Sequence, residues 1–200
     1  ASQKAMNFLA HAYLSGGDDQ IMVGNFIADA VKGNAFIKFP EAVQRGILLH
    51  RMIDEYTDNH TIFRSSKKRL QGKYDKFSGV IVDIYYDHFL ARDWVDYSDE
   101  SLEHFVSHAY RILIGNHSLL PVRSRRILPF MVSQNWLEGY ADLKELKQVF
   151  KGMSNRVKRY NSGMEDAVTD LEKDYELFHE DFKLFFPEII NYVNKKKDSI

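Results

Sequence analysis

The sequence predicts an all-α fold in which a single domain forms a helical bundle. Its 200 residues suffice for one domain with a substantial core, and a composition of 44% hydrophobic and 28% charged residues is ordinary for a globular protein. Apolar residues recur at helical spacing along most of the chain, whereas the alternation of β-branched residues typical of strands is nearly absent. No linker or repeat divides the chain, so residues 6–200 are expected to form one domain.

The first half of the chain predicts five helices separated by short breaks. They are expected at Met6–Leu14, from Asp18-Asp19 to about Lys32, at Glu41–Tyr56, at about Ile62–Gln71 and at Phe77–Val95. Gly16-Gly17 and Gly33-Asn34 follow the first two, because glycine readily takes the left-handed conformation that ends a helix. Pro40 suits the first turn of the third.

The second half predicts more helices with proline breaks. Ser98-Asp-Glu-Ser is a capping sequence for Leu102–Ile114. The region after it is expected to be broken into shorter helices by Pro121, Pro129 and Gly139. Further helices are expected at Ala141–Phe150 and Asn161–Phe185, and Pro187 is expected to separate a last helix that ends in Lys195-Lys-Lys.

Composition excludes several functional classes. The chain has no cysteine, which excludes disulfides and thiol catalysis and leaves His, Asp, Glu or Asn as metal ligands. The net charge of −1 gives no overall field that favours nucleic acid. No apolar run approaches the roughly 20 residues of a membrane span. Ala1–Ala5 are interpreted as a remnant before a natural start at Met6; no signal peptide is recognised, and a cytoplasmic location is expected.

Polar side chains interrupt four of the predicted helices, mostly at positions four apart, which share a helix face. Burying imidazole and carboxylate groups is unfavourable unless they are paired or bind a metal ion. We therefore predict a divalent metal site built from several helices. The predicted ligands are Asp29, His50, Asp54 and Asp87. The predicted catalytic residues, as proton donors or as groups that orient ligands, are His11, His88, Asp58 and Asp83.

A structural interpretation competes with the metal site at each position. A lone core histidine usually only hydrogen-bonds a carbonyl group, and for His11 this interpretation is as good as the metal site. His50 with Asp54 favours a ligand pair, because both lie on one helix face and other acidic groups recur nearby in the sequence. Asp83 fits either a ligand or a residue that orients one.

The predicted ligands suit hydrolysis at phosphorus. Carboxylate and imidazole groups bind Mn²⁺, Mg²⁺, Fe²⁺ or Zn²⁺, and such an ion lowers the pKa of water and offsets phosphate charge. The chain lacks both a phosphate-binding glycine-rich loop and a Gly-x-Ser-x-Gly motif.

Basic residues gather in three places. The first group directly follows the His50 helix and is predicted to bind an acidic partner; it contains Arg64, Lys67, Lys68 and Arg69. The other two groups lie at residues 123–126 and 156–159. A solvated helix face is the alternative interpretation for each group.

The polar segments together resemble the acyl carrier protein phosphodiesterase family. The matching runs are Met6-Asn-Phe-Leu-Ala-His11, Gly24-Asn-Phe-Ile-Ala-Asp29, His50-Arg-Met-Ile-Asp54-Glu-Tyr-Thr57-Asp58 and Asp83-Ile-Tyr-Tyr-Asp87-His88-Phe-Leu90. A weaker match continues through Trp136 and Gly152-Met153-Ser154 to the Phe-Pro at 186–187. That family is similar to the HD phosphohydrolases, although Asp87-His88 and the spaced His50 and Asp54 replace the usual adjacent His-Asp pair.

The resemblance implies an HD-phosphohydrolase-like fold and a metal-dependent phosphodiesterase. Its reaction would hydrolyse the 4′-phosphopantetheine arm from holo-acyl carrier protein to give apo-acyl carrier protein. Mn²⁺ is the expected ion, with Mg²⁺ or Fe²⁺ as alternatives, and the acidic carrier agrees with a basic docking surface. Two other functions stay open: an HD-like phosphohydrolase of a nucleotide or other small phosphoester, and a non-catalytic helical binding protein whose polar residues form structural networks.

Overall fold

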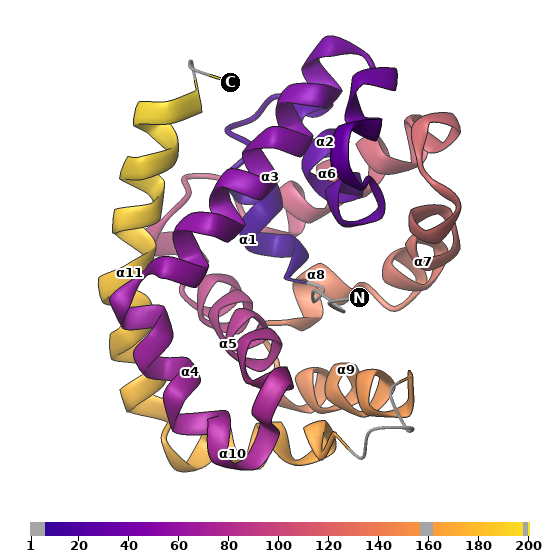
Figure 1. Ribbon diagram of the computed structural model, residues 1–200. Helices are drawn as coiled ribbons and strands as arrows, with labels where there is room; N and C mark the ends of the chain where they lie inside the picture. The colour runs from indigo at the N-terminus through magenta and orange to yellow at the C-terminus, as the bar shows by residue number, and fades with distance from the viewer. Residues whose placement is uncertain (1–6, 157–161, 198–199) are drawn as a thin grey trace.

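The computed structural model describes residues 7–156, 162–197 and 200, and every regular element within them is helical (Figure 1). This confirms the predicted all-α fold class. The α-helices are α1 (Phe8–Tyr13), α2 (Asp19–Ile27), α3 (Glu41–Asn59), α4 (Thr61–Tyr74), α5 (Ser78–Arg92), α6 (Leu102–Gly115), α7 (Val122–Ser133), α8 (Trp136–Gly139), α9 (Leu143–Arg156), α10 (Ala167–Lys173) and α11 (Tyr175–Lys196). The interpreted remnant at residues 1–5 and the predicted helix start at Asn161 lie outside the described residues.

Helix α5 lies in the main apolar core, as its nearly continuous run of apolar residues predicts. It packs against α1, α4 and α11, and the long α11 runs along one side of the molecule in Figure 1. A smaller core contains Val23, Ile27, Val43 and Ile47 of α2 and α3 together with residues of α6 and α7. None of the described helices combines the length and apolar character that crossing a bilayer requires.

Helices α2 and α3 make close backbone contact through two glycines. A Cβ atom added to Gly24 would lie 2.1 Å from the carbonyl oxygen of Val43, and one added to Gly46 would lie 2.2 Å from the carbonyl oxygen of Ile21. Any larger residue at either position would push the helices apart, since backbone atoms cannot move aside cheaply. The two glycines therefore allow the next residue on α2, Asn25, to approach α3.

The predicted helix breaks at Pro129 and Pro187 are wrong, because these residues lie inside α7 and α11. Proline removes one backbone hydrogen bond and its ring crowds the carbonyl group four residues earlier. Both prolines are exposed, so water can hydrate that carbonyl group. On α11, the buried Phe182 and Phe186 hold the helix against the core beside Pro187.

Candidate metal centre

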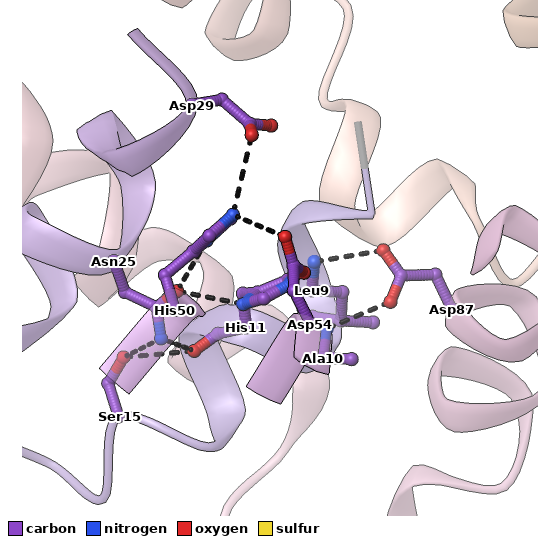
Figure 2. Close-up of polar contacts among 9 residues, drawn as sticks. All are labelled: Leu9, Ala10, His11, Ser15, Asn25, Asp29, His50, Asp54 and Asp87. Atoms are coloured by element: carbon purple, nitrogen blue, oxygen red, sulfur yellow. Dashed lines mark hydrogen bonds and ion pairs between the residues drawn. The ribbon is translucent and has the colours of Figure 1, made fainter. Parts of the chain in front are cut away.

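Four polar side chains from three segments in the first part of the chain converge (Figure 2): His11 of α1, Asp29 of the 3-10 turn Ala28–Ala30, and His50 and Asp54 of α3. Nε2 of His11 lies 3.4 Å from one oxygen of Asp54, and Nε2 of His50 lies 3.4 Å from the other. Nε2 of His50 is also 3.5 Å from Oδ1 of Asp29. Ligand atoms of His11, His50 and Asp54 all lie within 4.8 Å of one another. The group could therefore share one ion.

Asn25 sets the orientation of both imidazole rings. Its Oδ1 lies 2.8 Å from Nδ1 of His11 and 3.0 Å from Nδ1 of His50. Its amide nitrogen donates to the carbonyl oxygen of His11 at 2.9 Å and to the hydroxyl of Ser15 at 3.2 Å, so Oδ1 is the end that faces the rings. Because a carboxamide oxygen only accepts, both Nδ1 atoms must carry the protons. Each Nε2 is thereby turned away from Asn25 toward the carboxylates, as Figure 2 shows.

The two Nε2 atoms are buried and have no hydrogen-bond partner among the described residues. Their distances of 3.4–3.5 Å to the carboxylate oxygens exceed the roughly 2.7–3.2 Å of an N–H···O bond. In neutral imidazoles the Nε2 lone pairs would face negative oxygens, which is repulsive unless a cation lies between them. Donor atoms about 2.0–2.1 Å from a tetrahedral ion are about 3.4 Å apart. The centre therefore fits a divalent cation.

The charges of the centre also favour a cation. Burial lowers the pKa of His11, and the neighbouring His50 lowers it further. Burial opposes protonation of His50 too, but Asp29 and Asp54 outweigh it and raise the pKa of His50 to about 9. Although burial acts in the opposite direction, the two imidazoles hold the pKa of Asp54 far below its usual range. The site thus stabilises one added positive charge, which a proton on His50 or a metal ion can supply.

Asp87, a predicted ligand, lies outside this centre and contacts the start of α1 instead. Its two oxygens accept hydrogen bonds from the backbone N–H groups of Leu9 and Ala10 at 3.0 and 2.9 Å. These are among the N–H groups that a helix start leaves without an intrahelical partner. Burial raises the pKa of Asp87 to about 7, although the two hydrogen bonds act to lower it. Asp87 therefore anchors α1 and so positions His11.

The other predicted catalytic residues also lie outside the centre. Nδ1 of His88 is 2.7 Å from the carbonyl oxygen of Tyr140 and its Nε2 is 2.7 Å from the hydroxyl of Tyr175, so both ring nitrogens have partners. Asp58 is exposed one turn after Asp54, where α3 has already passed the centre. Asp83 is half-buried one turn before Asp87 on α5.

Sequence reasoning assigned no role to Asn25, which the structure makes the common partner of both histidines. One signal was present: Asn25 is a polar residue in the apolar run of α2 and lies four residues before Asp29. Its bridging position depends on the close contact of α2 with α3, which the spacing of residues along one helix cannot show.

The predicted partner-binding residues lie on α4, the helix that directly follows α3. Arg64, Lys68 and Arg69 are exposed and Lys67 is half-buried. Arg69 forms an ion pair with Asp181 of α11, so part of its charge is already neutralised.

Comparison with known proteins identifies the family. The family model described as acyl carrier protein phosphodiesterase matches residues 6–189. The acyl carrier protein phosphodiesterase of Salmonella agona (strain SL483) is 33% identical over 192 residues, which cover 96% of this chain and 99% of that protein. The protein of the same name from Yersinia enterocolitica is 30% identical over 193 residues, or 96% and 100% of the two chains. No solved structure matches, so the likeness to HD phosphohydrolases stays a prediction. The chain belongs to the acyl carrier protein phosphodiesterase family.

Proposed function

We propose that this protein is a metal-dependent phosphodiesterase that hydrolyses the 4′-phosphopantetheine arm from holo-acyl carrier protein and releases the apo-protein. Membership of the family supports the reaction, since the relatives from Salmonella and Yersinia carry that name. One observation carries the metal dependence: the buried Nε2 atoms of His11 and His50 face two carboxylates and have no hydrogen-bond partner among the described residues.

His11, His50 and Asp54 would hold the ion, with Asp29 as a fourth donor beside His50. A mixed set of imidazole and carboxylate groups suits Mn²⁺ or Fe²⁺ better than Mg²⁺, which prefers oxygen ligands and retains water. We propose Mn²⁺. Bound there, a divalent ion offsets the phosphate charge and lowers the pKa of water so that it can attack phosphorus.

Other residues of the chain hold this arrangement in place. Asn25 keeps the protons of both imidazoles on Nδ1, which leaves each Nε2 free to donate its lone pair. Asp87 fixes the start of α1, and hence His11, through two backbone hydrogen bonds. The side chains of Asp29 and Asp54 are 29% and 19% exposed, so we propose that the phosphodiester approaches from their side.

His88 is better explained as a positioning residue than as the predicted proton donor. Both of its ring nitrogens are occupied, and burial lowers its pKa. It connects α5 to Tyr140 and Tyr175.

We propose that the acidic surface of the carrier protein docks on the basic residues of α4, chiefly Arg64, Lys67 and Lys68. These side chains form no ion pair with the residues that the structure describes, whereas Arg69 is paired with Asp181. Opposite charges on the two proteins would raise the association rate more than the affinity.

The test is to incubate the purified protein with holo-carrier protein and to follow loss of the arm by mass spectrometry. Activity should disappear after chelation and return with Mn²⁺. In ¹⁸O-labelled water, the label should enter phosphopantetheine and not the carrier serine, because the attack is at phosphorus. Turnover of a nucleotide panel with no action on holo-carrier protein would contradict the proposal, as would full activity in the presence of a chelator.

A further inference from the structure

A cavity of about 280 Å³ lies between α7, α8 and α9. Its volume is near the lower end of the roughly 300–1,000 Å³ of small-molecule sites. Phe130 and Trp136 form an aromatic part of its lining, and Val149 and Met153 add apolar surface. A volume of this size suits a slender organic group and is too small for a folded partner.

Hydrogen-bonding groups line the same cavity, but no cationic side chain does among the residues that the structure describes. They are Gln134, Glu145 and Gln148. The indole N–H of Trp136 donates to Oε1 of Gln134 at 2.8 Å, which leaves the amide N–H₂ of Gln134 to donate to a ligand carbonyl. The carboxylate of Glu145 can accept from a ligand N–H. A phosphate would lack a counter-charge here, whereas a neutral chain of amides and methylenes would match both kinds of lining.

Different residues of the short helix α8 face the cavity and a small space beside His11 of the metal centre. Trp136 and Gly139 line the cavity, whereas Leu137 lines a space of about 20 Å³ that also touches His11. In Figure 1, α8 lies between the start of α1 and α9. A helix with its side chains is about 10–12 Å wide. An extended pantetheine arm is longer than this, so its phosphate and its thiol end can lie on different sides of α8.

Two backbone features occur at the cavity. Asn135 has a φ of 46° and turns the chain between Gln134 and Trp136, both of which line the cavity. Such left-handed conformations are uncommon outside glycine and gather at functional sites. On α9, a Cβ atom added to Gly152 would meet nothing within 4 Å, so a larger residue there would project into free space. Trp136 and Gly152 also belong to the weaker part of the family match, for which no role was assigned.

We infer that this cavity binds the neutral, amide-containing part of the pantetheine arm while the phosphodiester lies at the metal centre. The inference rests on the proposed function and adds a binding site for the part of the substrate that carries no charge. It also assigns recognition of the arm to α7–α9, apart from the basic docking surface on α4.

The test fills the cavity with the substitution Gly152→Phe. The matched control is Gly115→Phe on α6, also a glycine within a helix with nothing within 4 Å of an added Cβ atom and away from the docking surface on α4. Replacing a helical glycine favours the helix, so both variants should fold, which circular dichroism checks. Pantetheine, which lacks the phosphate, is titrated into the wild type and both variants by calorimetry. Gly152→Phe should weaken its binding at least about tenfold, the lower end of what fit in an apolar pocket contributes, and Gly115→Phe should not.

A second measurement compares kcat/KM for holo-carrier protein with that for a small phosphodiester without the arm. The ratio of the two should fall about tenfold in Gly152→Phe and stay at the wild-type value in Gly115→Phe. If the wild type cleaves holo-carrier protein but does not bind pantetheine, or if the two variants behave alike, the cavity assignment is overturned and the proposed function stands. If the wild type binds pantetheine through Gly152 but cleaves neither substrate, the proposed function fails and the cavity assignment stands.

Discussion

Two clusters of histidine and aspartate in this molecule have similar composition but opposite hydrogen bonding. In the metal centre, Nε2 of His11 and of His50 lack hydrogen-bond partners among the described residues. The second cluster, which we call the α5–α11 network, contains His88, Arg92, Asp93, Tyr175 and His179. There Nε2 of His88 contacts the hydroxyl of Tyr175, Arg92 donates to the same hydroxyl at 2.8 Å, and His179 pairs with Asp93.

The two clusters differ in whether their buried polar groups require an added cation to be satisfied. A buried polar group without a partner costs free energy, whereas a satisfied network contributes to stability. The α5–α11 network is complete by itself, and the metal centre becomes complete only with an added cation. Judged by residue type alone, both clusters would be candidate metal sites. Whether the histidine Nε2 atoms already have hydrogen-bond partners separates a metal site from a structural network more reliably.

The largest effect is expected for Asp54→Ala at the metal centre. It removes the carboxylate shared by both imidazoles, so Mn²⁺ affinity and kcat/KM for holo-carrier protein should fall by about 10³-fold or more. The control Asp93→Ala breaks the ion pair with His179 in the α5–α11 network. It should keep Mn²⁺ affinity but lose about 1–3 kcal/mol of unfolding free energy, because His179 loses its partner. Mn²⁺ binding is measured by calorimetry. If Asp54→Ala binds Mn²⁺ as tightly as the wild type does, the metal centre does not differ from the α5–α11 network in the way described.

Asn25→Leu should have the next largest effect, since it removes the acceptor that orients both rings. Mn²⁺ affinity should fall about 10–100-fold, as for other residues that orient metal ligands. Nitrogen-15 NMR of the metal-free protein should show the proton of the neutral His11 no longer confined to Nδ1. Asn25→Asp retains an acceptor oxygen and should recover much of the loss. Tyr175→Phe, which removes the hydroxyl used by His88, is the control and should leave Mn²⁺ binding unchanged. If Mn²⁺ affinity falls equally in Asn25→Leu and Tyr175→Phe, the loss comes from disturbed packing and not from the orientation of the two imidazole rings.

The metal centre should also bind Mn²⁺ more tightly as the pH rises. Below about pH 9 the metal-free protein carries a proton on His50, because its carboxylate neighbours raise its pKa to about 9. Mn²⁺ must displace that proton, so its affinity should increase about tenfold per pH unit from pH 7 and level off above pH 9. Calorimetry in buffers of different ionisation enthalpy should detect release of about one proton per ion at pH 7. An affinity that does not change over this range would mean that His50 is not a ligand.

The smallest effect is expected at the docking surface, which lies outside both clusters. Arg64→Glu with Lys68→Glu should raise KM for holo-carrier protein about 3–10-fold through slower association, and added salt should reduce the difference. Mn²⁺ affinity should not change. Arg123→Glu with Arg125→Glu on α7 is the matched control, since these arginines are exposed too. A larger rise in KM for the α7 pair would move the docking surface there.

The fold class and part of the centre could be predicted because they depend on spacing along single helices. The four-residue interval placed His50 and Asp54 on one face of α3, and Asp29 was found on the neighbouring segment. The same rule could not predict which part of the molecule packs against a given helix face. Asp87 is also on the buried face of its helix, but that face meets the backbone of α1.

The other differences between the predicted and the observed structure also depend on tertiary structure, which the sequence pattern does not show. Asn25 became visible as a partner of both histidines only after the approach of α2 and α3 was known. The proline rule failed for Pro187 because exposure allows water to replace the lost hydrogen bond, which no sequence pattern indicates.

The candidate ligands all come from the segment between His11 and Asp54, on elements that follow one another in the chain. Contacts within this segment close shorter loops than the contact of Asp87 with the start of α1, so they cost less chain entropy. A cation that binds only the assembled helices stabilises them by mass action. The first part of the chain could then become ordered around its ion during synthesis, before α5 is made and Asp87 secures α1. On this view, metal supply affects the yield of folded protein as well as its activity.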